Sequence, residues 1–275
     1  MKCTYPKLCL LVFCFLLFRF PVTVVAQVEH EEVPEIKGTQ PSAFNFGADI
    51  VSRYIWRGSD YGNSPAIQPN VSFSVAGFKI GAWGSYGFVP WAKKINDSTS
   101  VSMGNFVETD FTISYTLKGF TLMVTDYFFP NGVYPNEDNK YYNWDHETTG
   151  HTLEASLSYA GPDKFPIPVF AGVHIYGADK GKDSLGVWGA GSNNNYSSYF
   201  EAAYQFYVKG IGVKPFIGGI PYESSWYGTS AGIVNLGFMV SKNIKITQDY
   251  SLPIYTSIIT NPQKQSIFFV FGITL

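Results

Sequence analysis

The chain has 275 residues, of which 15% are charged and 17% are aromatic, and its formal net charge is −2. Soluble domains carry about 25% charged residues, and nucleic-acid-binding domains need a basic surface, so the composition argues against both classes. All three cysteines (Cys3, Cys9 and Cys14) fall in the leader described next, which excludes a small secreted domain stapled by disulfides.

The N-terminal segment 1–26 has the features of a cleaved signal peptide. It begins with basic residues, continues with an apolar run over 8–18 and offers a cleavage site after Ala26. An anchoring helix is the alternative, but Arg19 and Pro21 interrupt it before it reaches the roughly 20 apolar residues that a span needs. We therefore expect an exported protein and, from the features below, one that resides in the outer membrane of a Gram-negative bacterium.

Residues 27–43 are acidic and contain prolines, and they predict a flexible periplasmic lead-in. From Phe44 onward apolar and polar residues alternate with a period of two, which is typical of strands with two different faces. After residue 26 no apolar run is long enough for a membrane helix. These features predict one domain over 44–275, an all-β transmembrane antiparallel β-barrel.

Twelve segments show this alternation: 44–57, 66–76, 78–88, 106–117, 120–129, 151–159, 167–176, 198–208, 211–218, 234–246, 251–260 and 267–275. Short connections at 77, 118–119, 160–166, 209–210 and 248–249 alternate with long ones at 58–65, 89–105, 130–150, 177–197 and 219–232. Only 261–265 breaks the trend. An even strand count with this asymmetry predicts an up-and-down meander with short periplasmic turns and long extracellular loops.

A soluble sandwich or lipocalin-like barrel would also alternate with a period of two. Its outward face would carry many charges, whereas the polar face here is mostly Gly, Ser, Thr and Asn, which suits a confined lumen better. The closing segment has a wholly apolar face, formed by Ile267, Phe269, Phe271, Ile273 and Leu275. We expect this face to meet lipid and the strand to seal the barrel against 44–57. Its other face places Phe268 and Val270 in the lumen and predicts a tight pore.

Four stretches near the start of the predicted barrel have a characteristic sequence: Ser52-Arg53-Tyr54-Ile55-Trp56-Arg57-Gly58, Pro65-Ala66-Ile67-Gln68, Gly77-Phe78 and Gly81-Ala82-Trp83-Gly84-Ser85. These stretches resemble the TorF-like porin family of outer-membrane barrels. The ending, with Leu252-Pro253, Asn261-Pro262 and Phe271-Gly272, is similar to barrels of Bacteroidetes-type bacteria. The resemblance covers 44–88 and 230–275, leaves the loops 130–150 and 177–197 unassigned, and implies diffusion or uptake of small solutes. The terminal Leu275 departs from the terminal aromatic residue common in barrel-assembly signals.

Charged residues on the lumen-facing parity are candidates for a constriction. They are Asp49, Arg53, Arg57, Lys79, Glu108, Asp110, Glu154, Glu201 and Lys214. In one interpretation, acids on the fourth to eighth strands face basic residues on the first, third and ninth and set up a transverse field that orients polar solutes. In the other, the charges pair with one another inside a narrow, nearly filled lumen.

Aromatic residues fall into two groups. Those near strand ends predict interfacial girdles: Tyr54, Trp56, Trp83, Trp91, Tyr115, Tyr159 and Phe206. Those in the long loops are candidates for stacking on sugars or for packing as a lid: Trp144, Trp188, Trp226 and Tyr227. The loop group keeps open an alternative function, a structural or adhesive outer-membrane barrel that acts through its loops.

An outer-membrane lipid-modifying enzyme is the least favoured class, because none of the histidines forms a His-x-Ser pair. The polar cluster Asp138, Asp145, His146, Glu147 and His151 is interpreted as a solvated loop, so we expect no metal and no cofactor. The predicted function is a porin-like channel for passive or weakly selective passage of small polar solutes. Its expected partners are outer-membrane lipid and the barrel-assembly machinery, with no nucleic acid.

Overall fold

The computed structural model describes residues 43–96, 99–130, 139–162, 166–187, 189 and 193–275, with side chains described throughout except at 91–103. The predicted signal peptide 1–26 and nearly all of the lead-in 27–43 lie outside these ranges. Within them, no helix is long and apolar enough to cross a membrane.

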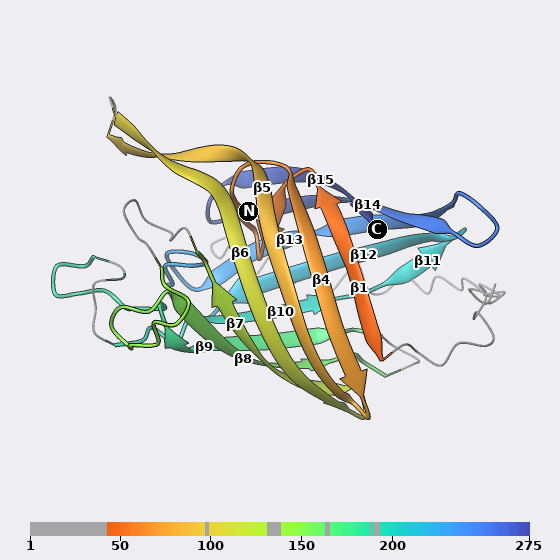
Figure 1. Ribbon diagram of the computed structural model, residues 1–275, viewed down its shortest axis with the longest axis horizontal. Helices are drawn as coiled ribbons and strands as arrows, with labels where there is room; N and C mark the ends of the chain where they lie inside the picture. Colours follow the sequence, from red (N-terminus) through yellow and green to blue (C-terminus); the bar gives the residue numbers. More distant parts are fainter. Residues whose placement is uncertain (1–42, 97–98, 131–138, 163–165, 188, 190–192) are drawn as a thin grey trace, which may run out of the picture. The chain divides into compact units, whose positions relative to one another are not determined.

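The described residues form antiparallel strands in a meander (Figure 1). The strands are β1 (Phe44–Val51), β2 (Tyr54–Trp56), β3 (Ser59–Tyr61), β4 (Ala66–Val75), β5 (Phe78–Asn96), β6 (Thr99–Leu117), β7 (Phe120–Phe128), β8 (His151–Tyr159), β9 (Val169–Gly177), β10 (Ser198–Ala203), β11 (Phe206–Val208), β12 (Ile211–Ile220), β13 (Gly232–Lys245), β14 (Ser251–Asn261) and β15 (Ser266–Thr274).

The sheet closes into a barrel with 12 strand positions, as the sequence predicted. The last strand pairs with the first through Asp49 with Thr274, and Ile50 with Ile273. Strands β10 and β11 are two parts of one broken strand, since both pair with β12. Closure matters because an open sheet edge would leave a row of unpaired backbone groups.

The two faces of the wall differ as the alternation predicted. Large apolar side chains such as Ile113, Leu122 and Phe269 are exposed on the outer wall. Between them, Ser114 and Ser257 point inward and are buried. The hydrophobic clusters of the described residues lie inside the barrel, where most of their members come from the long-loop end.

The predicted first strand, 44–57, is wrong in its second half. The wall strand β1 ends at Val51, and the hairpin β2–β3 then forms a separate two-stranded sheet. The period-two pattern continues through Tyr54 and Trp56, but those side chains are partly buried against lumen residues instead of facing outward. A period of two cannot distinguish these cases, because an apolar face can be covered by lipid or by the interior of the barrel.

The predicted connection 89–105 is also wrong, because most of it is strand. Strands β5 and β6 each run for 19 residues and pair almost to Asn96 and Thr99. Their hairpin extends well beyond the neighbouring strands (Figure 1). Three register shifts and the adjacent apolar residues of 88–92 interrupt the alternation that would have revealed it.

A bulge in β13 turns one predicted outward residue inward. Gly218 pairs with Asn235 but Gly219 pairs with Ile233, so Val234 is the extra residue. In the alternating segment 234–246 Val234 has the same parity as the outward-facing Leu236, yet it is completely buried in a cluster with Tyr199 and Tyr227.

Candidate functional site

The hairpin β2–β3, which we call the plug hairpin, turns into the lumen through a tight turn at Arg57 and Gly58. Their φ angles are 49° and 78°, the left-handed pair that two-residue hairpins require. A Cβ atom on Gly58 would lie 1.9 Å from the carbonyl oxygen of Val234. The tip of the plug hairpin is therefore pressed against the backbone of β13.

Arg57 joins the plug hairpin to the wall. Its Nη1 donates a hydrogen bond of 2.5 Å to Oε2 of Glu154 on β8, and its Nη2 donates one of 2.8 Å to Oε1. The same Nη1 donates to the hydroxyl of Tyr227 at 2.5 Å. The Arg57 side chain is 9% exposed and that of Glu154 is 0% exposed. This is a largely buried, bidentate ion pair, the strong form of such a contact.

Aromatic rings surround the guanidinium of Arg57. Its Cζ lies 4.5 Å from the ring centroid of Trp56, 4.7 Å from Tyr199, 5.0 Å from Phe170 and 5.6 Å from Tyr227. Each distance is within the range of a cation–π interaction. Arg57 thus sits in an aromatic cage with a carboxylate on one side.

A second layer of polar contacts holds the cage. Nε2 of His174 lies 2.9 Å from the Tyr227 hydroxyl and 3.4 Å from Oε2 of Glu154. The Tyr199 hydroxyl donates to Glu201 at 2.6 Å and accepts from Nδ2 of Asn235 at 2.9 Å. These bonds fix the orientation of both the carboxylate and the rings.

A second aromatic cluster lies beside the plug hairpin. Tyr54 packs against Trp83, Tyr61 and Phe106, with centroids 5.4 to 6.0 Å apart. Trp83 has the inward parity of its wall strand, where it pairs with Asn70 and Asp110. The predicted girdle assignment is therefore wrong for Tyr54, Trp56 and Trp83. Tyr115, in contrast, is outward and exposed.

The loop between β12 and β13 also enters the lumen. Trp226 stacks on Phe129 at 5.8 Å, and Tyr227 is completely buried beneath Arg57. The structure therefore brings two of the four loop-aromatic candidates into the interior, where Tyr227 contacts Arg57, and it does not leave them as an exposed surface.

The short turn between β14 and β15 clamps both inserted segments. Nδ2 of Asn261 donates to the carbonyl oxygen of Gly58 at 3.1 Å, and Nζ of Lys264 donates to Oγ of Ser59 at 2.8 Å. The side chain of Gln263 accepts from Thr229 N and donates to the Ser230 carbonyl. These four contacts are all hydrogen bonds.

Glu108 and Asp110 form an acidic part of the lumen next to the second cluster. They are 2% and 7% exposed, on adjacent inward positions of β6 that pair with Ser85 and Trp83. Oε2 of Glu108 and Oδ1 of Asp110 have no hydrogen-bond partner in the part of the chain that is described. A buried carboxylate without a cationic partner is costly.

The remaining lumen candidates lie apart from the cage. Asp49 accepts a hydrogen bond from the Thr274 hydroxyl at 2.6 Å, and Arg53 pairs with Asp60 at 3.2 Å inside the plug hairpin. Lys79 is exposed and Lys214 is partly exposed, each a few residues from a short turn. Of the predicted opposed charges, the structure joins Arg57 with Glu154 directly.

The third loop aromatic, Trp144, lies on the outer wall. It stacks on His151 at 3.8 Å, and Nδ1 of His151 lies 2.9 Å from the Asp126 carboxylate. Asp126 pairs with Phe111 and Leu153, so its side chain points outward. The loop that carries Trp144 covers this side chain, which is buried. The fourth, Trp188, lies outside the described residues.

The polar loop cluster is occupied by structural contacts. Asp145 accepts hydrogen bonds from the backbone N–H of Glu147 and from Thr148, which hold the pKa of its carboxyl below the usual value. His146 accepts a hydrogen bond from Nζ of Lys180 at 3.0 Å. Among the described residues no group of three potential metal ligands is present, and Asp138 lies outside them.

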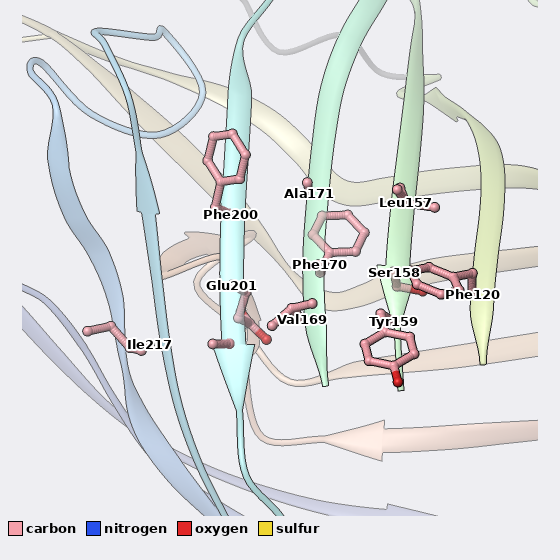
Figure 2. A pocket seen from close by; sticks show the side chains of 11 residues that line it. Phe120, Leu157, Ser158, Tyr159, Val169, Phe170, Ala171, Phe200, Glu201 and Ile217 are labelled. Carbon is pink, nitrogen blue, oxygen red and sulfur yellow. The ribbon is translucent and has the colours of Figure 1, made fainter. Parts of the chain in front are cut away.

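An apolar groove of about 510 Å³ runs along the outside of β8, β9, β10 and β12. Figure 2 shows the large side chains of Leu157 and Phe200 on either side of the small Ala171. The groove is lined mostly by outward-facing residues, but its lining also includes Phe170, one of the rings around Arg57.

Sequence reasoning missed His174, Phe170 and Tyr199 as cage residues. All three have the inward parity of their strands, so parity could have placed them in the lumen. Their convergence on Arg57 depends on closure of the barrel and on the inward turn of the plug hairpin. No protein-family model matches the sequence, and no curated protein matches it either.

Proposed function

We propose that the protein is an outer-membrane channel for small polar solutes whose lumen is closed by the plug hairpin. One observation carries this proposal: the side chains that surround Arg57 at the tip of the plug hairpin are buried inside the barrel. Glu154 and Tyr227 are 0% exposed, His174 is 1% and Tyr199 is 2% exposed. These residues come from β8, β9, β10 and the β12–β13 loop, and they meet at the plug hairpin.

The outer wall supports a membrane location. Large apolar residues such as Phe111, Leu122, Phe238 and Phe269 are exposed on several strands of the barrel. Exposing such a surface to water is unfavourable, whereas lipid tails would cover it. Closure of the barrel also pairs the backbone N–H and C=O groups between strands, which a bilayer requires. The resemblance to TorF-like porins points in the same direction and stays a prediction. Lipid and the barrel-assembly machinery are the partners that this location requires.

The way the plug hairpin is attached supports a movable element. Strands β2 and β3 pair with each other and not with the wall sheet. The Arg57 ion pair and the clamp from Asn261 and Lys264 hold the tip from different sides. Withdrawal of the hairpin would thus break side-chain contacts and a few hydrogen bonds. It would leave the backbone hydrogen bonds between the wall strands intact.

A structural or adhesive barrel is the second candidate. The long β5–β6 hairpin projects from the barrel and offers paired backbone and a polar sequence to a partner. In that case the filled lumen would be a permanent core. The two candidates differ in whether the barrel without its plug hairpin conducts ions.

Planar-bilayer recordings test the proposal. In the variant that we call plug-less, a Gly-Ser linker of equal length replaces 53–62. In the control, a similar linker replaces the exposed turn 183–187. We expect small, intermittent currents from the wild type and the control, and large steady currents from the plug-less protein. A plug-less protein that is folded and heat-modifiable on gels but carries no current would overturn the channel proposal and favour the structural barrel.

A further inference from the structure

The cage around Arg57 is built mainly by the barrel and not by the plug hairpin. Its carboxylate comes from β8 (Glu154), two of its rings come from β9 and β10 (Phe170 and Tyr199), and a third comes from the β12–β13 loop (Tyr227). Only Arg57 and its neighbour Trp56 belong to the hairpin. Arg57 thus occupies the position of a ligand in a site that the wall supplies.

The site has the chemistry that recognises a guanidinium group. The two oxygens of Glu154 match the two Nη atoms, with distances of 2.5 and 2.8 Å. The rings of Tyr199 and Phe170 lie within cation–π distance of the planar group. The Tyr227 hydroxyl accepts from the same Nη1, so the site offers acceptors and π faces in a fixed arrangement.

The site would not stay empty at low cost. Glu154 is completely buried, and the polar neighbours at its oxygens besides Arg57 include His174 at 3.4 Å. Removing Arg57 would leave a desolvated carboxylate that needs another cation or a large rearrangement. A cation that arrives through the lumen can meet this need when the plug hairpin withdraws.

We propose that the cage of Glu154, Phe170, Tyr199 and Tyr227 is a binding site for solutes that carry a guanidinium group, and that Arg57 is a resident occupant that such a solute replaces. The binding site stands on the geometry of the cage. Its role in passage through the barrel rests on the proposed channel function.

Chemical rescue tests the binding site in detergent solution, where no channel activity is needed. The Arg57→Ala substitution removes the atoms that ethylguanidinium would replace. Lys118→Ala is the matched control, because Lys118 and Gly119 form the same turn with φ angles of 49° and 82°. Alanine is compatible with that backbone, since Ala76 adopts a φ of 49° before Gly77.

We expect Arg57→Ala to lower the unfolding temperature by about 5–15 °C, and ethylguanidinium to restore most of this loss. Sodium and ethylammonium at equal ionic strength should restore little, because neither presents a planar fork. The double variant Arg57→Ala/Glu154→Gln should gain nothing from ethylguanidinium. The Lys118→Ala control should lose little stability and should not respond.

Equal responses of Arg57→Ala and the double variant to ethylguanidinium would overturn the site. If Arg57→Ala does not fold without ligand, the refolding yield with and without ethylguanidinium gives the same decision, and an unchanged yield overturns the proposal. The bilayer currents of the plug-less protein decide the channel function separately. Rescue without current would therefore keep the site and remove the channel.

Discussion

The guanidinium of Arg57 and the carboxylate of Glu154 form two hydrogen bonds, of 2.5 and 2.8 Å, between residues 97 positions apart in the chain. One residue is at the tip of a hairpin that pairs with no wall strand, and the other is on β8 of the wall. This contact therefore joins the plug hairpin to the barrel and places a buried charge pair inside it.

Glu154→Gln should destabilise the protein strongly. The amide keeps the shape of the side chain but leaves Arg57 as a buried cation without a counter-ion, a change that costs about 3–5 kcal/mol. Thermal unfolding followed by circular dichroism, or by loss of the heat-modifiable band on gels, measures this cost.

Glu223→Gln is the matched control for that substitution. Glu223 pairs with Lys182 at 2.6 Å, but the side chain of Glu223 is 46% exposed. Loss of an exposed pair costs about 0–1 kcal/mol. Similar losses for the two variants would show that the Arg57 contact does not behave as a buried ion pair.

Gly58→Ala should prevent the plug hairpin from seating. Its Cβ atom would lie 1.9 Å from the Val234 carbonyl oxygen, in addition to the strain of an alanine at a φ of 78°. We expect the hairpin to be displaced, which protease cleavage within 53–62 and increased bilayer current would report.

Gly210→Ala separates the clash from the strain. Gly210 has a φ of 72°, and a Cβ atom there would meet nothing within 4 Å. This variant should lose only about 1–2 kcal/mol from the left-handed backbone and should keep the wild-type current. Equal behaviour of the two glycine variants would mean that the hairpin tip does not need its contact with Val234.

Phe269→Lys should test whether the outer wall faces lipid. Phe269 is outward on β15 and strongly exposed. A lysine on the lipid face costs about 2–4 kcal/mol near the bilayer midplane. The unfolding free energy of protein reconstituted in vesicles measures this. Tyr142→Lys is the control, because Tyr142 is an exposed loop residue, and a loss as large as that of Phe269→Lys would argue against a lipid-facing wall.

The plug-less protein should prefer cations. Replacing 53–62 removes the Arg53–Asp60 pair and Arg57, a net loss of one positive charge, while Glu108, Asp110, Glu154 and Glu201 remain on the inward face. An acidic lumen with a potential of a few kT gives a cation preference of about 10-fold, which the reversal potential in a salt gradient measures.

Adding Glu108→Gln and Asp110→Asn to the plug-less protein should move that reversal potential toward zero. The two carboxylates lie together on β6 without a basic partner among the described side chains. An unchanged reversal potential would place both residues outside the conducting path or show them to be neutral there.

Much of the wall was predictable from the sequence because a strand with two different environments has a period of two. This period identified both faces of β15, including Phe269 outside and Val270 inside. It failed in the extensions of β5 and β6, where register shifts interrupt the alternation, and at the bulge of β13, where Val234 leaves the parity of its strand.

The candidate site was predictable in its parts but not in its assembly. Arg57 and Glu154 were both recognised as lumen charges, and Tyr227 as a loop aromatic. The sequence alone could not say that these three side chains touch, because their contact requires an inward turn after Val51 and an inserted loop between β12 and β13.

The sequence by itself therefore determined a closed barrel, its number of strands and the face on which most wall residues lie, because these follow from local alternation and short turns. Only the tertiary structure decided that the plug hairpin turns into the lumen and that Arg57 lies in a cage. The physical reason is that a buried ion pair and an aromatic cage depend on distances between strands far apart in the chain, which no local pattern records.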